Sequence, residues 1–365
     1  MMDIAHGQEE RLGMRKTTVG IVFGGCSTEY GVSLSSAAAV IDHLDRSRYE
    51  IVMIGMTREG HWYRYVGETA LIREDRWSEH AGCVPAALSP CRNRKGLIEF
   101  AGTEYRLTPL DVVFPVLHGK NGEDGTLQGL LELSGLPFVG CGTLSSAICM
   151  DKAYAKTIVK AAGIDVPDSV TVFPGGSVAE AVAAADKLGF PLYVKPARSG
   201  SSIGISKAYN ETELASGIEQ ALRHDGKLVI ERHVDGCELG CAVLGGSDPI
   251  VGEIDEIALT GEFFDYDEKY SLSTAVIHLP SRIDANTAVR VKDTALRIYR
   301  ELGCSGFARI DLFLAKDGRL LFNEVNTIPG FTAKSRYPNM MRHAGIEFTA
   351  LLDRLIGSAL TEQRT

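Results

Sequence analysis

Four polar side chains on two neighbouring predicted strands could hold a divalent metal ion. Arg309 and Asp311 precede a short turn at residues 316–318, and Glu324 and Asn326 follow it. Side chains alternate along a strand, so each pair shares a face, and hairpin pairing would bring both pairs together. Two carboxylates and an amide oxygen suit Mg²⁺, and the guanidinium suits phosphate charge. We predict a metal site at Asp311, Glu324 and Asn326; the alternative is a solvated sheet face with ordinary ion pairs.

A loop rich in glycine and serine follows Lys195 and has the composition of a phosphate-binding loop. Residues 195–204 have the sequence KPARSGSSIG, and small residues let backbone N–H groups turn toward phosphate oxygens while the lysine adds positive charge. The loop has neither Walker A nor GxGxxG spacing. Lys152, Glu231 and Glu238 are further candidates for nucleotide contacts. The alternatives are an ordinary turn, a surface lysine and capping carboxylates.

Two strand ends in the first part of the chain offer contacts for a small charged substrate. Glu29 closes the segment GGCSTE after the first predicted strand, and His118 follows another strand. Ligands of open parallel sheets bind beyond the carboxyl ends of the strands. There a carboxylate can hold an ammonium group and a histidine can hold a carboxylate, although a lone histidine is more often structural. The segment FFDYDEKYS at residues 263–271 could act as a lid or be a surface loop.

The composition limits the classes of protein that remain. The chain has 365 residues, 45% hydrophobic and 23% charged, and its net charge is −9. Without a basic block, nucleic acid is an unexpected partner. No apolar stretch reaches the length of a membrane helix, about 18–20 residues, and the N-terminus lacks the apolar core of a secretory signal. Eight scattered cysteines predict free thiols in a reducing cytoplasm. We expect residues 1–16 to be a disordered extension.

Short β-branched runs alternate with segments of helical periodicity, which predicts an α/β protein of three compact modules. We place the modules at residues 17–140, 141–230 and 231–365, the first with a parallel sheet. We expect a helix with Ser33 as its N-cap and one long helix from Leu144 to Ala162, while residues 57–105 give no assignable element. Strands are expected at 17–23, 49–56, 112–117, 137–140, 170–173, 192–196, 228–231, 238–244, 250–257, 275–279, 309–314 and 320–323. Other helices are expected at 123–134, 178–188, 211–222, 286–302 and 348–359.

Seven motifs in order give the chain a close resemblance to the D-alanine–D-alanine ligases. They are GGCSTE, HGKNGEDGTLQG, MDK, KPARSGSSIG, EKY, ARIDLF and NEVNTIPGFT, and the match covers about residues 17–358. The resemblance implies a three-domain ATP-grasp fold with a Rossmann-like N-terminal domain, and a lid at about residues 260–275. It also implies ATP and two Mg²⁺ (or Mn²⁺) as cofactors and a cytoplasmic homodimer that makes a cell-wall precursor dipeptide.

One branch of this family is more similar than the others. The segment Ser335-Arg336-Tyr337-Pro338 resembles the vancomycin-resistance ligases, where housekeeping enzymes carry leucine in place of Arg336. The EKY motif ending at Tyr270 resembles the D-alanine–D-serine ligases (VanG type) and favours an amine nucleophile over D-lactate. The sequence departs from the family at Gly31, where a second glutamate is usual, which puts the rigidity of that loop in doubt.

The resemblance also assigns roles to individual residues. It implies ATP contacts at Lys152, Lys195, Ser202, Glu231, Val234 and Glu238, with metal ligands at Asp311, Glu324 and Asn326. Glu29 and His118 would position the first D-alanine, and Arg309 and the N–H of Gly330 would face the tetrahedral oxyanion. Ser201 and Tyr270 would close the lid and assist proton removal. Lys269 and Ser335 would bind the second carboxylate, and Arg336, with Phe263 or Phe264, would favour the hydroxyl of D-serine.

Three other functions remain open at this point. The first is a D-alanine–D-alanine ligase with a resistance-like second subsite. The second is another ATP-grasp carboxylate ligase, which would share the nucleotide and metal residues but lack the loops at Glu29 and His118. The third is a nucleotide-binding regulator that does not turn over its nucleotide.

Overall fold

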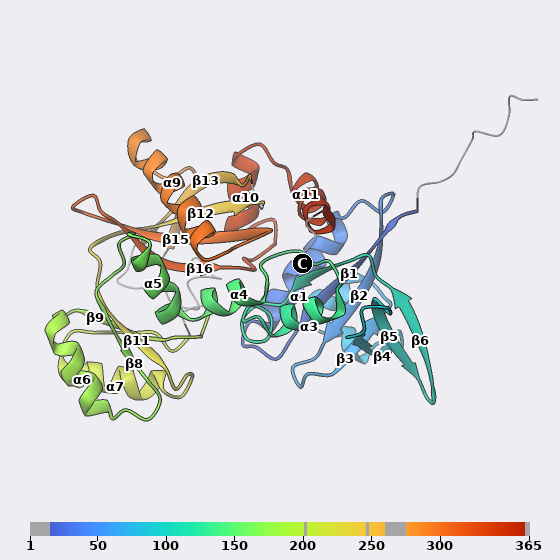
Figure 1. Ribbon diagram of the computed structural model, residues 1–365, viewed down its shortest axis with the longest axis horizontal. Helices are drawn as coiled ribbons and strands as arrows, with labels where there is room; N and C mark the ends of the chain where they lie inside the picture. Colours follow the sequence, from blue (N-terminus) through green and yellow to red (C-terminus); the bar gives the residue numbers. More distant parts are fainter. Residues whose placement is uncertain (1–14, 201–202, 246–247, 260–274, 362–365) are drawn as a thin grey trace, which may run out of the picture.

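Three β-sheets with flanking helices make up the molecule (Figure 1). The computed structural model describes residues 15–200, 203–245, 248–259 and 275–361. Each sheet is built from consecutive strands of the chain. The α/β fold class predicted from the sequence is confirmed. Among the described helices, none has both the length and the apolar character needed to cross a bilayer.

Residues 17–134 form the N-terminal sheet and its helices. These are β1 (Thr17–Gly24), α1 (Tyr30–His43), β2 (Tyr49–Met56), β3 (Trp62–Tyr65), α2 (Thr69–Arg73), η1 (Trp77–Glu79), β4 (Cys83–Leu88), β5 (Gly96–Ala101), β6 (Glu104–Pro109), β7 (Val112–Val116) and α3 (Thr126–Ser134). The strand order is β6-β5-β4-β3-β2-β1-β7. Only β2, β1 and β7 are parallel to one another. The stretch without predicted elements supplies the antiparallel strands β3, β4 and β5 and the start of β6.

The central sheet has four antiparallel strands in the order β10-β9-β11-β8. Two helices lead into it and two more accompany it. The elements are α4 (Thr143–Met150), α5 (Lys152–Ala161), β8 (Ser169–Val172), α6 (Val178–Ala185), η2 (Asp186–Leu188), β9 (Leu192–Pro196), β10 (Ser206–Ala208), α7 (Glu211–Ala221) and β11 (Leu228–Arg232).

The C-terminal sheet has five antiparallel strands in the order β14-β13-β12-β15-β16. Its elements are β12 (Gly236–Leu244), β13 (Ile250–Leu259), β14 (Ala275–His278), α9 (Ala285–Glu301), β15 (Phe307–Ala315), β16 (Leu320–Asn326), α10 (Arg336–His343) and α11 (Phe348–Thr361). The predicted hairpin between β15 and β16 is confirmed. Helix α10 and strand β10 were not among the elements predicted from the sequence.

Three local predictions are wrong. The expected single helix from Leu144 to Ala162 is two helices, because Asp151 interrupts it. The Asp151 side chain caps α5 by accepting the N–H groups of Ala153 and Tyr154. Helix α1 begins at Tyr30, and Ser33 is not its N-cap: its buried hydroxyl accepts the Gly24 N–H and donates to the Val116 carbonyl. The strand expected at 137–140 is a single bridge to β7.

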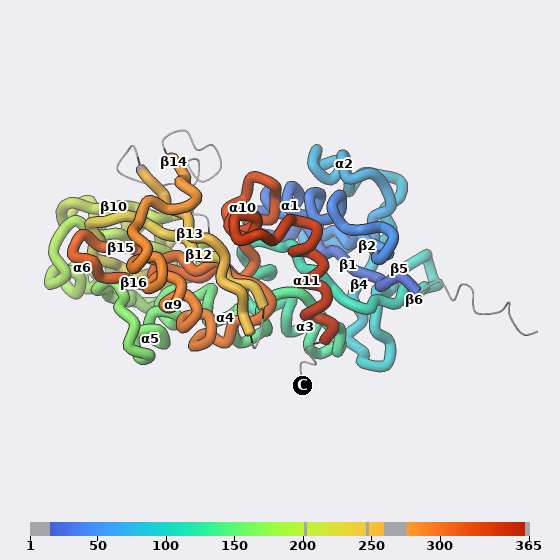
Figure 2. The backbone as a smooth tube through the Cα atoms, turned by 90° about the horizontal axis from the view of Figure 1, so that it is seen from above, coloured from blue at the N-terminus to red at the C-terminus, as the bar shows by residue number. Residues whose placement is uncertain are grey.

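One hydrophobic cluster joins the N-terminal sheet to the C-terminal part of the chain. Phe23 and Phe114 belong to the same buried cluster as Phe307, Phe331 and Tyr337. Helix α11 packs against α1, β7 and α10, and Figure 2 shows α11 beside α10 and α1 from above. The central sheet has a separate cluster beneath α6 and α7. The first and last parts of the chain therefore share a core, while the central sheet has its own.

Two glycines meet at the contact between these parts of the chain. Gly306 has φ +65°, and a Cβ there would lie 2.7 Å from the backbone nitrogen of Gly140. The Ser305 hydroxyl donates to the Gly140 carbonyl at 3.1 Å. Gly303 has nearly the same φ, +63°, but open space around the position of a Cβ. A comparison of substitutions at Gly303 and Gly306 therefore distinguishes the cost of backbone strain from the cost of close packing.

We expect Gly303→Ala to lower the free energy of unfolding by about 1–2 kcal/mol, the cost of a left-handed alanine. Gly306→Ala should cost about 1–3 kcal/mol more, because its methyl group must displace the backbone at Gly140. Urea denaturation of both variants measures the difference. Equal losses would contradict the close packing of Gly306 against Gly140.

Candidate active site

The hairpin of β15 and β16 brings together the polar side chains predicted to meet there. Arg309 pairs with Asn326 in register, and Asp311 pairs with Glu324. The Asp311 carboxylate, only 1% exposed, accepts hydrogen bonds from Arg309 Nε and Nη2 at 2.8 and 2.7 Å and from Asn326 Nδ2 at 3.0 Å. Glu324 lies 3.4 Å from the ammonium of Lys152. The alternation of side chains along both strands explains this convergence.

These residues have the donor chemistry of a site for a hard cation. Two carboxylates and an amide supply oxygen ligands of the kind Mg²⁺ prefers, and rotation of the Asn326 amide would present its oxygen in place of its nitrogen. No group of three or more histidine, cysteine or acidic side chains in the described residues could by itself hold a metal. The predicted set, with only two carboxylates, would therefore need ligands from a bound substrate or water. The three residues fit Mg²⁺, and their role as ligands remains a prediction.

A cavity of about 380 Å³ opens between the central and C-terminal sheets. Its walls come from α5, β9, β11, β12, β13, β15 and β16. The predicted ATP contacts that belong to the described residues line it: Lys152, Lys195, Glu231, Val234 and Glu238. Glu324 lines it too. The side chains of Ile257 and Phe313 add apolar wall. The cavity thus combines an apolar region, suited to a planar base, with ammonium groups suited to phosphates.

A buried charge network forms part of one wall of this cavity. We call the cavity the nucleotide cavity, after the ATP contacts predicted from the sequence. Glu231 pairs with Lys195 at 2.6 Å and with Lys156 at 3.0 Å. Burial alone would raise the pKa of Glu231, but the two ammonium groups outweigh it and lower the pKa to about 2. Burial likewise opposes the charge on Lys195, but Glu231 outweighs it and raises the pKa of Lys195. Glu231 is therefore a carboxylate throughout the physiological pH range.

Lys156 is a site residue that the sequence reasoning missed. Its ammonium also donates to the carbonyls of Phe322 and Asn323, at 3.3 and 2.9 Å, and so ties α5 to β16. Lys156 follows Lys152 by four residues, which places both on one face of α5. That spacing was the signal available in the sequence.

The root of the Gly/Ser loop is tied to α5 and to the turn between α7 and β11. The Lys152 N–H donates to the Ala197 carbonyl at 3.0 Å, and its ammonium donates to the Ser199 carbonyl at 2.9 Å. Arg198 forms a forked ion pair with Asp225. Ser201 and Ser202, predicted for catalysis and ATP binding, lie outside the described residues. The contacts of Lys152 fix the point from which the loop leaves the sheet.

Glu29 lies where the N-terminal strand ends meet the Gly/Ser loop. Its side chain is largely buried, with the residue 8% exposed. A Cβ on Gly119, or one on Gly200, would come within 2.6 Å of Glu29 Oε2. The two glycines therefore allow loops from different sheets to approach one carboxylate. This proximity is what the predicted role of Glu29 in first-substrate binding requires, and that role remains a prediction.

His118 is buried at the same edge with both ring nitrogens engaged. Nδ1 lies 2.8 Å from the Ile328 carbonyl, and Nε2 lies 3.1 Å from the Ser36 hydroxyl. Burial lowers the pKa of His118, and the nearby Glu29 only partly opposes this effect. Both ring nitrogens therefore have protein partners in this structure. The role of His118 in positioning the first D-alanine remains a prediction.

Arg336 is held by a carboxylate that the sequence reasoning did not single out. Its Nε and Nη2 each donate to an oxygen of Asp255 at 2.7 Å. Nη2 also lies 3.7 Å from Asp311, and Nη1 lies 3.8 Å from Glu238. Burial opposes the charge, but Asp255 and Asp311 raise the pKa of Arg336 above its usual range. Arg336 therefore lies between a predicted metal ligand and a predicted ATP contact.

The remaining predicted residues are only partly placed. Gly330 and Ser335 are neighbours: a Cβ on Gly330 would lie 3.0 Å from the Ser335 hydroxyl, which accepts the Thr332 N–H at 3.0 Å. Phe263, Phe264, Lys269 and Tyr270 lie outside the described residues, as does nearly all of the predicted lid.

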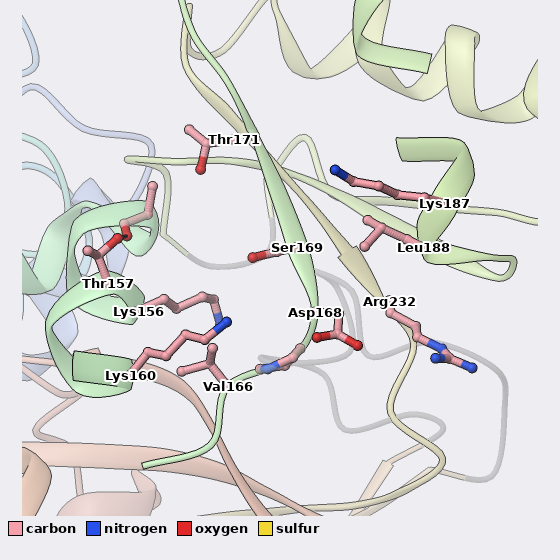
Figure 3. A pocket seen from close by; sticks show the side chains of 12 residues that line it. Lys156, Thr157, Lys160, Val166, Asp168, Ser169, Thr171, Lys187, Leu188 and Arg232 are labelled. Atoms are coloured by element: carbon pink, nitrogen blue, oxygen red, sulfur yellow. Dashed lines mark hydrogen bonds between the residues drawn. The ribbon is translucent and has the colours of Figure 1, made fainter. Parts of the chain in front are cut away.

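A second hollow, of about 480 Å³, lies between α5 and β8 (Figure 3). Lys160, Lys187 and Arg232 line it, together with the side chain of Lys156 on its way to Glu231. None of the residues predicted from the sequence lines this hollow. The candidate active site is therefore the nucleotide cavity and the polar ribbon beside it.

Comparisons with known proteins agree with this geometry. The family model described as D-ala D-ala ligase N-terminus matches residues 18–141, and the model described as D-ala D-ala ligase C-terminus matches residues 158–357. A D-alanine–D-alanine ligase of Caldicellulosiruptor bescii is 42% identical over 96% of this chain and 97% of its own length. The vancomycin B-type resistance protein VanB of Enterococcus faecalis is 44% identical over 95% of this chain and 99% of its own.

A solved structure is similar over nearly the whole chain. The crystal structure of the VanG D-Ala:D-Ser ligase from Enterococcus faecalis superposes with a TM-score of 0.88 at 49% identity. The match covers 94% of this chain and 100% of that one.

We expect Glu231→Gln to lower the free energy of unfolding by about 3–5 kcal/mol near neutral pH, because it leaves two buried ammonium groups without their counter-charge. The lowered pKa of Glu231 sets the pH dependence. Its stabilisation is complete above its ordinary pKa of 4.5 and is lost as the pH falls toward 2. Urea denaturation across this range measures both effects.

The exposed Glu219 on α7 offers a matched control. Glu219→Gln should change the stability by about 0.5 kcal/mol or less at any pH. The charge network would not be the source of the stability if wild type and Glu231→Gln kept the same difference in free energy of unfolding below pH 4.5.

Proposed function

The chain belongs to the D-ala D-ala ligase family, and we propose that this ATP-dependent ligase joins D-alanine to D-serine through a D-alanyl phosphate intermediate. The product would be a cell-wall precursor dipeptide with reduced affinity for vancomycin. We further propose that the enzyme works as a cytoplasmic homodimer, as the resemblance to the family implies.

One observation supports this activity above the others. The predicted ATP contacts line the nucleotide cavity, and the Asp311 and Glu324 carboxylates converge in register beside it. The Glu29 carboxylate meets the loop that follows Lys195 through the close approach at Gly200. The residues predicted to contact a triphosphate therefore lie near the residue predicted to hold an amino acid, which supports an enzyme that activates a carboxylate with ATP.

The first step activates D-alanine. Lys152 and Lys195 supply positive charge to the phosphates, and Glu29 holds the substrate ammonium. The D-alanine carboxylate attacks the γ-phosphorus of ATP, which forms D-alanyl phosphate and releases ADP. Asp311, Glu324 and Asn326 would hold Mg²⁺, which neutralises phosphate charge when bound.

The second step forms the peptide bond. The neutral amine of D-serine attacks the acyl carbon, loses a proton and displaces phosphate. In its described hydrogen bonds Arg309 uses Nε and Nη2 on Asp311, so we assign its Nη1 to the oxyanion, together with the Gly330 N–H. Ser201 and Tyr270 would assist proton removal, and Lys269 and Ser335 would bind the carboxylate of the second substrate.

The preference for D-serine is assigned to Arg336. The fork with Asp255 fixes the guanidinium plane, so a remaining N–H can donate to the substrate hydroxyl in a set direction. A site built around such a hydrogen bond disfavours the analogue that lacks the hydroxyl. The 49% identity to the VanG D-Ala:D-Ser ligase supports the same preference. D-alanine as the second substrate is the alternative that the relatives named D-alanine–D-alanine ligase favour.

Phosphate release with ATP, Mg²⁺ and D-alanine, with D-serine, D-alanine or D-lactate added in turn, tests the proposal. Identification of the products by mass should give D-alanyl-D-serine as the main product, and a metal chelator should stop its formation. D-alanyl-D-alanine as the main product in an equal mixture would support the alternative. ATP turnover that needs neither amino acid would contradict both, and no turnover under any condition would favour a nucleotide-binding regulator.

We expect Arg336→Leu to lower the ratio of kcat/KM for D-serine to that for D-alanine by about 10- to 100-fold, which corresponds to one lost hydrogen bond to a charged group. The ratio is measured by competition between the two amino acids in one reaction. Because both substrates compete for the same enzyme molecules, a loss of folded protein does not change the ratio.

Two further variants complete this test. Arg336→Leu combined with Asp255→Asn removes the carboxylate that the single change leaves buried, and it should show the same shift. Arg342→Leu removes an exposed arginine from the same helix and should leave the ratio unchanged. An unchanged ratio in the Arg336 variants would remove the assignment of specificity to this residue.

A further inference from the structure

The segment Thr327–Phe331 follows β16 and carries Gly330, and side chains from the N-terminal part of the chain hold its backbone. The Ile328 N–H donates to Glu123 Oε1 at 2.9 Å, and the Ile328 carbonyl accepts from His118 Nδ1 at 2.8 Å. The Phe331 N–H donates to the Ser36 hydroxyl at 3.1 Å. The segment is therefore held on both sides of Gly330.

The three holding side chains, which we call the clamp (Ser36, His118 and Glu123), are connected to each other. His118 Nδ1 faces a carbonyl and must donate, so in the neutral ring Nε2 is an acceptor. The Ser36 hydroxyl then donates to Nε2 and accepts from Phe331. Glu123 Oε2 accepts the N–H of Gly119, the residue after His118. The donor and the acceptor of each hydrogen bond in the network are thus set by the neighbouring bonds, so removal of one member disturbs the others.

Packing fixes the same segment from the other side. Phe331 stacks on Tyr337 and packs edge-on against Phe307 and Phe114, with ring centroids 5.4–6.0 Å apart. The ring of Pro329 limits the backbone directly before Gly330. Ile328 and Phe331, on either side of Pro329 and Gly330, are thus held in place. The Gly330 N–H therefore has little freedom to change direction.

The clamp is costly for the stability of the fold. Burial and the nearby Glu29 raise the pKa of Glu123 to about 8, so its charged form is disfavoured where it lies. An apolar contact at this junction would avoid that cost. A costly polar arrangement around a backbone N–H is typical of a functional site, where orientation matters more than stability.

We infer that Ser36, His118 and Glu123 are positioning residues for the Gly330 N–H, and that the N-terminal sheet thereby aligns the oxyanion contact of the C-terminal sheet. The inference rests on the proposed function. The N–H acts on the oxyanion of the second step, when the amine attacks the acyl carbon. Loss of the clamp should therefore slow peptide-bond formation and leave phosphoryl transfer from ATP to D-alanine largely intact.

Ser36→Ala tests this inference, because it removes the acceptor of the Phe331 N–H from a fully buried position. Two rates are measured on the full chain. Positional isotope exchange in γ-¹⁸O-labelled ATP with D-alanine reports phosphoryl transfer, and product formation with D-alanine and D-serine reports ligation. We expect ligation kcat to fall about 10-fold or more, with exchange within about 2-fold of wild type.

Ser35→Ala is the matched control, since Ser35 is exposed and its hydroxyl bonds only within α1 among the described contacts. It should change neither rate. If Ser36→Ala does not fold, Glu123→Gln gives a second test, because its amide replaces one acceptor with a donor. The same split is expected.

The outcomes separate the two proposals. Equal loss of exchange and ligation in Ser36→Ala, or loss of neither, overturns the positioning role. A wild-type protein without exchange and without dipeptide contradicts the proposed function instead. A wild-type protein with both activities and a variant defective only in ligation supports the clamp.

Discussion

Charge compensation between two sheets is the constraint on which the site depends. Glu231 is buried against two ammonium groups, and Asp311 is buried against two guanidinium groups. A single buried charge is expensive, whereas a paired and hydrogen-bonded one is tolerated. The pairing also fixes the strand register, because a shift by one residue would move Asp311 to the face where Ile310 and Leu312 enter the apolar core.

The close approach of two loops explains why glycines lie beside the Glu29 carboxylate. Loops from the N-terminal and central sheets reach one acidic side chain, and any side chain larger than hydrogen would occupy the space of its oxygen. Gly119 additionally has φ +72°, which most residues avoid. The loops are thus rich in glycine both for conformation and for close approach. The hydrogen bonds of Ser36 and His118 to the Ile328–Phe331 backbone add a polar link between the N-terminal sheet and the segment that follows β16.

Local patterns predicted the parts of the site whose partners are close in sequence. Alternation along β15 and β16 was sufficient to gather Asp311 and Glu324 on one surface, since only the tight turn at residues 316–319 separates the strands. The helix break at Asp151 was missed because the apolar pattern continues across it. Asp255 and Ser36 were missed because their partners lie 81 and 295 residues away. A lone aspartate on an apolar strand or a lone serine on a helix carries no periodic signal for such pairing.

The position of Arg336 connects the residue proposed to select the second substrate with the rest of the site. Asp255 is fully buried, and apart from Arg336 its described hydrogen-bond donor is the Gly240 N–H at 3.1 Å. A leucine at position 336 would leave that carboxylate largely uncompensated, at a cost of several kcal/mol. An enzyme of this fold that lacks the arginine would therefore need an uncharged residue at position 255 as well. Because Arg336 also lies near Asp311 and Glu238, loss of its charge would alter the electrostatic balance of the nucleotide cavity as well. Arg336 is thus part of one set of buried charges, and its proposed role in specificity would depend on that whole set and not on one side chain.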